Sequence, residues 1–238
     1  MNDRPIIVSL DFPNARAALA CVEQLDPSLC QVKVGKELFT AAGPSMVESL
    51  MRQGFRVFLD LKYHDIPNTV AGACSVATKM GVWMLNVHAS GGRRMLEAAA
   101  DAVIRNTPAG STKPILIAVT VLTSLSAVEL PEIGLAADVD AAVTCLSSLA
   151  KQSGLDGVVC SAQEAPLMRQ TFGQSFVLVT PGIRLATDAK GDQSRVVTPV
   201  DAIKMGSDYL VIGRSITGAA DPRAVLTMIS DSLKVAHP

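Results

Sequence analysis

The chain has 238 residues, of which 49% are hydrophobic, and its formal net charge is −1. This length suits one large α/β domain or two small ones, and the apolar content allows a sizeable core without disulfides. The near balance of acids and bases argues against a general nucleic-acid binder, which shows a basic excess. It leaves room for a small anionic ligand held by a few local cations.

The five cysteines are widely spaced and include no C-x-x-C pair. We interpret them as small core residues in a reducing compartment rather than as disulfides or a zinc site. The first residues run directly into a strand-like segment, without the basic, apolar and small-residue regions of a signal peptide. No apolar run reaches the length that spans a membrane. The sequence therefore predicts a cytoplasmic location and no membrane partner.

Short β-rich runs alternate with helical patterns along the whole chain. The runs are residues 5–11, 30–35, 55–62, 82–88, 114–122, 157–161, 176–181 and 209–213. The helical patterns are residues 14–25, a stretch broken at Gly43 and Pro44 that ends near Gly54, and residues 67–80, 93–106, 138–152, 162–171, 199–205 and 222–235. Near-continuous apolar runs are typical of parallel strands buried on both faces. Residues 182–194 show no apolar period and predict a mobile loop.

A strand followed by a helix, repeated eight times at about 30 residues a unit, predicts a (β/α)8 TIM barrel, with residues 1–238 as a single domain. A doubly wound open sheet is the competing architecture, and it more often carries a Gly-rich turn after its first strand. Here that turn is Asp11-Phe12-Pro13-Asn14, without glycine. No linker or domain boundary is visible in the sequence.

Polar residues stand at the carboxyl ends of most predicted strands, where barrel enzymes have their active sites. They are Asp11 after the first run, Lys33 in the second, Asp60 and Lys62 in the third with Asp65 beyond it, Thr123 after the fifth, the turn from Pro181 to Arg184 after the seventh, and Gly213 and Arg214 at the eighth. Each alone has an ordinary structural explanation, such as an ion pair or a helix cap. Their convergence on one rim predicts a pocket.

The loops after the seventh and eighth strands predict a phosphate site, because barrels often bind phosphate there. These loops supply Gly182 and Gly213, whose small size lets backbone N–H groups approach an anion. Arg214 adds a planar and permanently charged set of donors.

The three histidines, His64, His88 and His237, have no metal-ligand spacing, so no metal site is predicted. His64 beside the charged cluster is a candidate general base, although a lone histidine near a loop is more often structural. A Schiff-base role for Lys62 is a real alternative. Its flanking carboxylates, Asp60 and Asp65, favour the ammonium form, which suits proton donation better than nucleophilic attack.

The stretch Asp60-x-Lys62-x-x-Asp65-Ile66-x-x-Thr69 resembles the signature of the orotidine 5′-phosphate decarboxylase family, in its compact bacterial form. The resemblance extends over the whole chain and includes Asp11, Lys33, Thr123, the turn from Pro181 to Arg184, Gln193, Gly213 and Arg214. It implies decarboxylation of orotidine 5′-monophosphate to UMP in de novo pyrimidine biosynthesis. It also implies a homodimer that uses no metal or other cofactor.

The same resemblance implies roles for single residues. Lys62 would protonate C6 of the pyrimidine after carbon dioxide leaves, and Asp60 would lie near the departing carboxylate. Lys33 and Asp11 would bind ribose hydroxyls and complete an alternating charge network. The neighbouring subunit would supply Asp65, Ile66 and Thr69. Thr123 and Pro181 would lie by the pyrimidine. The phosphate would be held by Arg184, Gln193, Gly213 and Arg214, with the loop after the seventh strand closing over it.

Two other functions stay open at this point. A magnesium-dependent sugar-phosphate decarboxylase or synthase of the same superfamily shares an Asp-x-Lys-x-x-Asp core, although the continuation Ile66-Pro67-Asn68-Thr69 argues against it. A non-catalytic nucleotide-phosphate sensor would need the phosphate site but not Lys62.

Overall fold

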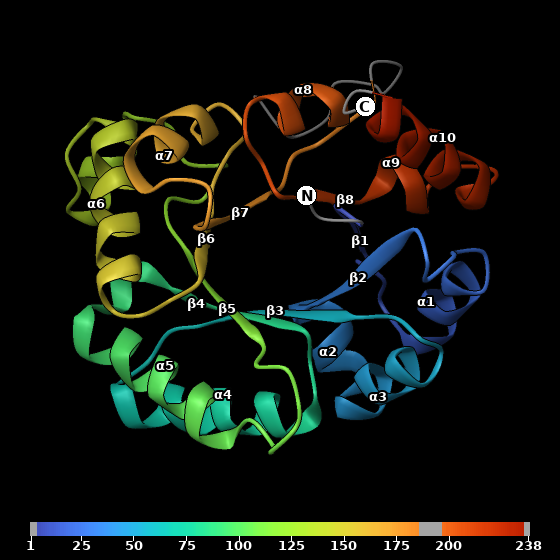
Figure 1. Cartoon of the computed structure of the whole chain (residues 1–238), viewed down its shortest axis with the longest axis horizontal. Coiled ribbons are helices and arrows are strands. Elements are labelled where there is room, and N and C mark those ends of the chain that lie inside the picture. Colours follow the sequence, from blue (N-terminus) through green and yellow to red (C-terminus); the bar gives the residue numbers. More distant parts are fainter. Residues whose placement is uncertain (1–3, 186–196, 236–238) are drawn as a thin grey trace.

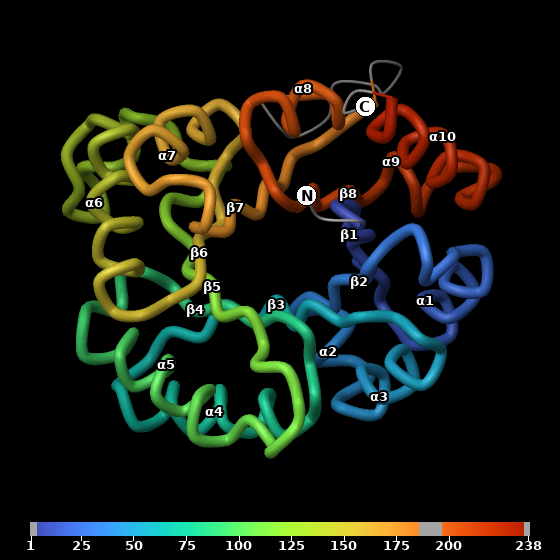
Figure 2. Tube along the Cα trace, viewed as in Figure 1, coloured from blue at the N-terminus to red at the C-terminus, as the bar shows by residue number. Residues whose placement is uncertain are grey.

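Eight parallel strands close into a barrel in the computed structural model, which describes residues 4–185 and 197–235. Each strand pairs with the next along the chain, and β8 pairs with β1 to close the ring. Figure 2 shows the chain passing round this ring in sequence order, so that its first and last strands meet. The strands are β1 Ile6–Ser9, β2 Cys30–Gly35, β3 Val57–Tyr63, β4 Met84–His88, β5 Ile115–Val119, β6 Gly157–Val159, β7 Val177–Thr180 and β8 Tyr209–Ile212.

Helices form an outer ring around the strands (Figure 1). They are α1 Ala15–Val22, α2 Lys36–Ala42, α3 Pro44–Arg52, α4 Pro67–Met80, α5 Arg93–Asn106, α6 Val139–Gln152, α7 Ala165–Phe172, α8 Pro199–Lys204, α9 Arg214–Thr217 and α10 Pro222–Val235. Two 3₁₀ turns, η1 Ala89–Gly91 and η2 Leu130–Ile133, lie in the connections. The predicted (β/α)8 architecture is confirmed.

Local chemistry sets several helix ends. The side chain of Asn14 accepts a hydrogen bond from the Ala17 N–H and caps α1. Gly43 separates α2 from α3 with φ of 65°, and Gly81 ends α4 in the left-handed conformation. Helix α7 begins three residues later than the predicted position 162, because the Glu164 carboxylate first accepts the Ser161 N–H in a turn.

Most strands are shorter than their apolar runs, and β1 and β5 lose two and three residues at their carboxyl ends. The sequence predicted β1 through Asp11, yet it ends at Ser9, and the last bond of this region joins Leu10 N–H to the Lys33 carbonyl. Strand β5 ends at Val119 rather than at residue 122. Here the Val159 carbonyl accepts the Thr120 hydroxyl at 2.9 Å, and the backbone bond from the Thr120 N–H to the same oxygen is long, at 3.5 Å.

The core has two layers that determine where polar residues can lie. One apolar cluster fills the space between strands and helices, and a smaller one that includes Ile7, Phe58 and Met84 fills the barrel interior. Side chains two positions apart share a face of a strand. On β1, β3 and β4 each of these apolar residues is followed, two positions later, by a polar one: Ser9, Asp60 and Asn86. The interior therefore changes from apolar to polar towards the carboxyl ends of these strands.

Among the described residues, no helix is long and apolar enough to cross a membrane. The cytoplasmic location stays a prediction.

Candidate active site

A cavity of about 370 Å³ opens at the carboxyl ends of the strands. This volume falls within the range of roughly 300–1,000 Å³ typical of small-ligand sites. Of the residues predicted from sequence, the structure places Asp11, Lys33, Asp60, Lys62, Thr123, Pro181, Arg184, Gly213 and Arg214 in the cavity lining. Residues from six strands or their following loops thus meet at one rim.

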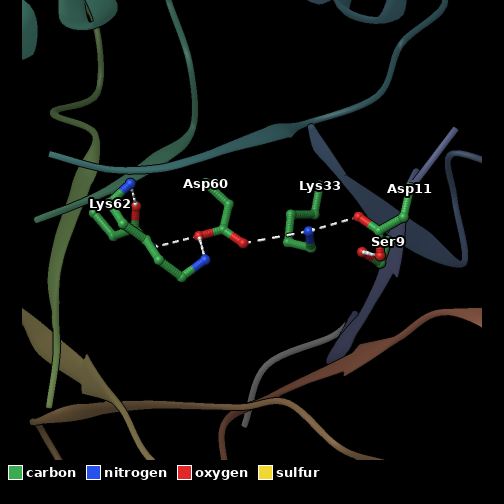
Figure 3. A network of polar contacts seen from close by, with 6 residues as sticks. Ser9, Asp11, Lys33, Asp60 and Lys62 are labelled. Carbon is green, nitrogen blue, oxygen red and sulfur yellow. Dashed lines mark hydrogen bonds and ion pairs between the residues drawn. The ribbon is translucent and has the colours of Figure 1, made fainter. Parts of the chain in front are cut away.

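Four charged side chains of alternating sign form a row along one side of the cavity, as Figure 3 shows. The Lys33 ammonium lies 3.1 Å from Asp11 Oδ1 and 3.3 Å from Asp60 Oδ2. The Lys62 ammonium lies 2.6 Å from Asp60 Oδ1. Asp60 therefore has a cation on each carboxylate oxygen. The Ser9 hydroxyl donates to Asp11 Oδ2 at 2.7 Å at the end of the row.

Burial and pairing act in opposite directions on Asp60, whose side chain is only 10% exposed. Burial alone would raise the pKa of this carboxyl, because the charged form loses hydration. The ammonium groups of Lys33 and Lys62, with hydrogen bonds from Lys62 and Asn86, outweigh burial and hold the pKa below its ordinary value. Asp60 is thus kept ionised between its two lysines.

Strand β3 is irregular where it carries these charges. Its pairing with β4 shifts register between Leu59 and Tyr63. Within the shift Lys62 has φ of 52°, and it is the one non-glycine residue of the described chain with positive φ. Asn86 on β4 faces this point: its side chain accepts the Lys62 N–H at 2.8 Å and donates to Asp60 Oδ1 at 2.7 Å.

Asn86 and Ser9 also belong to the site and were not predicted from the sequence. Asn86 did leave a signal, because it is an amide in the apolar run of residues 82–88, and a buried amide requires hydrogen-bond partners. Ser9 gave none, since a serine near a strand end is common.

The wall opposite the charges is apolar. It includes Val119 and Val159 from β5 and β6, together with Val121 and Leu122. A flat ring could therefore lie between an apolar face and a charged one.

Arginines line a further part of the cavity. Arg184 and Arg214 follow β7 and β8 and line it together with Gly182, Gly213 and Ser215. The Arg184 N–H bonds to the Val197 carbonyl at 3.2 Å. Gln193 and most of the predicted loop 182–194 lie outside the described residues.

Asp65, Ile66 and Thr69 do not line this cavity in the single chain. All three are exposed, Ile66 to 67%. The Asp65 carboxylate accepts the Ile66 N–H at 2.6 Å just before α4. The structure of one chain thus separates the segment of residues 65–69 from the charged row of its own cavity.

The two histidines near the rim pack against one another at a tilt of 41°, with 5.5 Å between the ring centroids of His64 and His88. Burial, and after it electrostatic interactions with His64, Lys36 and Lys62, lower the pKa of His88. Neither ring lines the cavity. Within residues 4–185 and 197–235, no three His, Cys, Asp or Glu side chains form a group that could hold a metal.

Comparisons with known proteins agree with one another. The sequence model described as "Orotidine 5'-phosphate decarboxylase / HUMPS family" matches residues 4–229. A protein of Neisseria meningitidis serogroup A named orotidine 5′-phosphate decarboxylase is 60% identical over 228 residues, which are 95% of this chain and 91% of that protein. One of the same name from Chromobacterium violaceum is 58% identical over 232 residues, 97% of this chain and 92% of its own length.

Similarity to solved structures extends over the whole barrel. The crystal structure of orotidine 5′-phosphate decarboxylase from Lactobacillus acidophilus superposes with a TM-score of 0.87 at 40% sequence identity. The match covers 97% of this chain and 99% of that one.

Proposed function

Because the chain belongs to the orotidine 5′-phosphate decarboxylase / HUMPS family, we propose that it is a carboxy-lyase that converts orotidine 5′-monophosphate to UMP and carbon dioxide. The observation that carries this proposal is the row Asp11, Lys33, Asp60 and Lys62, which holds an ammonium against a buried carboxylate at the cavity wall. A reaction that leaves a carbanion needs a cation in such a position.

The cavity walls match the three parts of this substrate. The pyrimidine would lie against the apolar wall near Thr123 and Pro181, with its C6 carboxylate towards Asp60 and Lys62. Lys33 and Asp11 would bind the ribose hydroxyls. The phosphate would bind Arg184, Gln193, Gly213 and Arg214, because guanidinium groups match phosphate oxygens in charge and shape.

The proposed reaction needs only groups of this chain and its substrate. The bond between C6 and the carboxylate breaks, carbon dioxide leaves, and the electron pair stays on C6. The Lys62 ammonium stabilises that charge and then transfers a proton to C6, and the neutral amine regains a proton from solvent. In this scheme no metal or organic cofactor takes part.

Binding energy from the phosphate helps to place the anionic substrate carboxylate beside Asp60. Two carboxylates close together repel, and interactions with a non-reacting part of the substrate can offset that repulsion. The two cavity arginines are the proposed source of this energy.

We further propose a homodimer in which each subunit completes the site of the other. The exposed segment with Asp65, Ile66 and Thr69 supports this arrangement, because it lies outside the cavity lining of its own chain. The neighbour's Asp65 would then extend the alternating row at Lys62.

The direct test is turnover of orotidine 5′-monophosphate by purified protein in EDTA, followed by the ultraviolet change as UMP forms. We expect turnover without added metal, and a loss of at least ~10⁴-fold in kcat for Lys62→Ala, because the proton donor is gone. No turnover by the wild-type protein would refute the proposal. A strict need for added magnesium would favour the sugar-phosphate alternative instead.

The phosphate assignment has its own test in Arg214→Ala. This variant should lose roughly 10–100-fold in kcat/KM for the nucleotide, since it loses a charge-assisted contact. It should lose less than about threefold for the nucleoside, which lacks the phosphate. Steady-state kinetics on both substrates measure the difference, and equal losses would place Arg214 elsewhere in the site.

A further inference from the structure

Lys62 has an unusual backbone for a residue with a long side chain. Its φ of 52° falls in the left-handed region, where a Cβ approaches the neighbouring carbonyl oxygen. Such a conformation persists only where surrounding groups hold it. The position coincides with the register shift in β3, so the regular ladder to β4 does not supply the restraint.

Asn86 supplies it from the neighbouring strand. It is fully buried, and its side-chain oxygen accepts the Lys62 N–H at 2.8 Å. Its side-chain nitrogen donates to Asp60 Oδ1 at 2.7 Å. The two partners fix the orientation of the amide, because an N–H requires an acceptor and a carboxylate requires a donor.

The contacts form a closed ring. Asp60 Oδ1, which accepts from Asn86, is also the oxygen that lies 2.6 Å from the Lys62 ammonium. One amide therefore holds the backbone of Lys62 and the carboxylate to which the Lys62 side chain is anchored. Both ends of that side chain are fixed through a single residue.

We propose that Asn86 is a positioning residue for the reaction, one that aims the Lys62 ammonium by holding its backbone and its Asp60 anchor together. This inference rests on the proposed function. It assigns Asn86 a task during the proton transfer. When Lys62 gives up its proton, Asp60 Oδ1 loses a charged partner, and the Asn86 N–H remains as the donor that keeps the carboxylate in place.

Two substitutions separate positioning from simple packing. Asn86→Leu keeps the number and branching of the side-chain heavy atoms and removes both hydrogen bonds. Asn86→Asp keeps the acceptor for the Lys62 N–H but places a second carboxylate against Asp60. Two carboxylates at this distance share one proton, so one pKa of the pair is strongly raised. The other ionisable side chains here are Lys62, Lys33 and Asp11 beyond Asp60, and His88 on the same strand, and they are common to the variant and the wild type, whose pH profile is the reference.

The expected kinetics follow from these bonds. Asn86→Leu should lose roughly 10–100-fold in kcat with less than about a threefold change in KM, since the phosphate contacts are intact. Asn86→Asp should approach the wild type at low pH, where the shared proton restores a donor to Asp60. Its kcat should then fall as pH rises and the pair becomes doubly ionised. A merely structural role predicts no such pH profile.

Gln31→Leu is the matched control. Gln31 is also a fully buried amide on a neighbouring strand, but neither of its side-chain polar atoms has a hydrogen-bond partner in the described structure. Its replacement should leave kcat within about threefold of the wild type. Circular dichroism confirms that each variant is folded.

An independent measurement is hydrogen exchange of the Lys62 amide, which does not depend on turnover. Exchange should be roughly tenfold faster or more in Asn86→Leu and remain slow in Asn86→Asp. If the wild type is inactive, the proposed function fails while exchange still tests the ring of hydrogen bonds. If Asn86→Leu does not fold, the pH profile and exchange of Asn86→Asp decide. Unchanged Lys62 protection in Asn86→Leu, or a wild-type pH profile in Asn86→Asp, would overturn the inference.

Discussion

At the scale of single residues, Gly35 leaves room for the charged row. A Cβ at this position would lie 3.1 Å from Lys33 Nζ and 3.4 Å from Asp11 Oδ1. The backbone itself tolerates a side chain, with φ of −89°. An added methyl group would thus push the Lys33 ammonium, which is the mobile end of a flexible chain, rather than disturb the strand.

Gly35→Ala should therefore impair function more than folding. We expect kcat/KM to fall about tenfold, because an ammonium displaced by a few tenths of an ångström weakens the row. The free energy of unfolding should change by less than about 1 kcal/mol. Gly72→Ala is the control: a Cβ there meets nothing within 4 Å in α4, and alanine is the better helix former by roughly 0.5–1 kcal/mol. Steady-state kinetics and urea unfolding on both variants test this difference. If Gly35→Ala were as active as Gly72→Ala, the prediction would be wrong.

Asp60 also links the site to acid stability. Burial opposes its ionisation, but Lys33, Lys62 and the hydrogen bonds lower its pKa in the folded protein. A lowered carboxyl pKa contributes stability above the unfolded value, which is about 3.9, and that contribution is lost as pH falls through the folded value.

Asp60→Asn should accordingly be less stable than the wild type at pH 7, by about 1–3 kcal/mol. The difference should stay constant down to about pH 5 and shrink at lower pH, where the wild-type carboxyl is protonated. Urea unfolding at pH 7, 5, 4 and 3 measures it. Parallel stability curves for the two proteins would count against this account of Asp60.

Sequence patterns were sufficient for some site residues and not for others. Asp60 and Lys62 were predictable because charges at the end of an apolar strand are costly unless they are used. Asn86 was missed because its importance depends on the irregular backbone of Lys62 on another strand, and neither the register shift nor the positive φ has a local signal.

At the scale of elements, two aspartates connect strands at the amino-terminal end of the barrel. Asp208, just before β8, accepts the Leu178 N–H of β7 at 2.7 Å, and Asp156, just before β6, accepts the Leu116 N–H of β5 at 2.8 Å. Arg169 of α7 pairs with Asp208 and donates to the carbonyls of Phe176 and Gly206. This arginine therefore ties a helix to the starts of two strands.

Arg169→Met should destabilise the protein by about 3 kcal/mol or more, because it leaves a carboxylate and carbonyls without their donor. Arg105→Met is the matched control, since Arg105 also pairs with an aspartate, Asp101, but its side chain is 75% exposed against 9% for Arg169. That exposed pair should contribute no more than about 0.5 kcal/mol. Urea unfolding measures the loss of stability in the two variants. Similar losses would show that the buried Arg169 network contributes no more than an exposed ion pair.

The number and order of the strands were predictable, because buried parallel strands give apolar runs. Their ends were less so. The run through Leu122 looks continuous, yet β5 stops where the Val159 carbonyl accepts both the hydroxyl and, at 3.5 Å, the N–H of Thr120. This strand end depends on a hydrogen bond between residues 39 positions apart, so no local sequence pattern predicts it.

At the scale of the whole molecule, the barrel separates stability from chemistry. The Arg169 network lies at the amino-terminal ends of the strands and the charged row at their carboxyl ends, a division common in this fold. The loop segment with Asp65 and Ile66 belongs to the second end but does not line its own cavity, and Ile66 is 67% exposed. The partner that we propose for this segment is a second copy of the chain.

Mixing two inactive variants tests whether the site is shared. If Lys62 acts in its own subunit and Asp65 in the neighbour's site, Lys62→Ala and Asp65→Ala are each inactive alone. A mixed dimer then contains one site with both substitutions and one with neither. Random exchange at equal amounts makes half the dimers mixed, so about a quarter of wild-type activity should return. The recovery is measured by activity assays after incubation under conditions that allow subunit exchange. The controls are each variant alone and each variant mixed with Arg105→Met. Lack of recovery, when exchange is demonstrated by mass-labelled subunits, would show that Asp65 serves its own chain or no site at all.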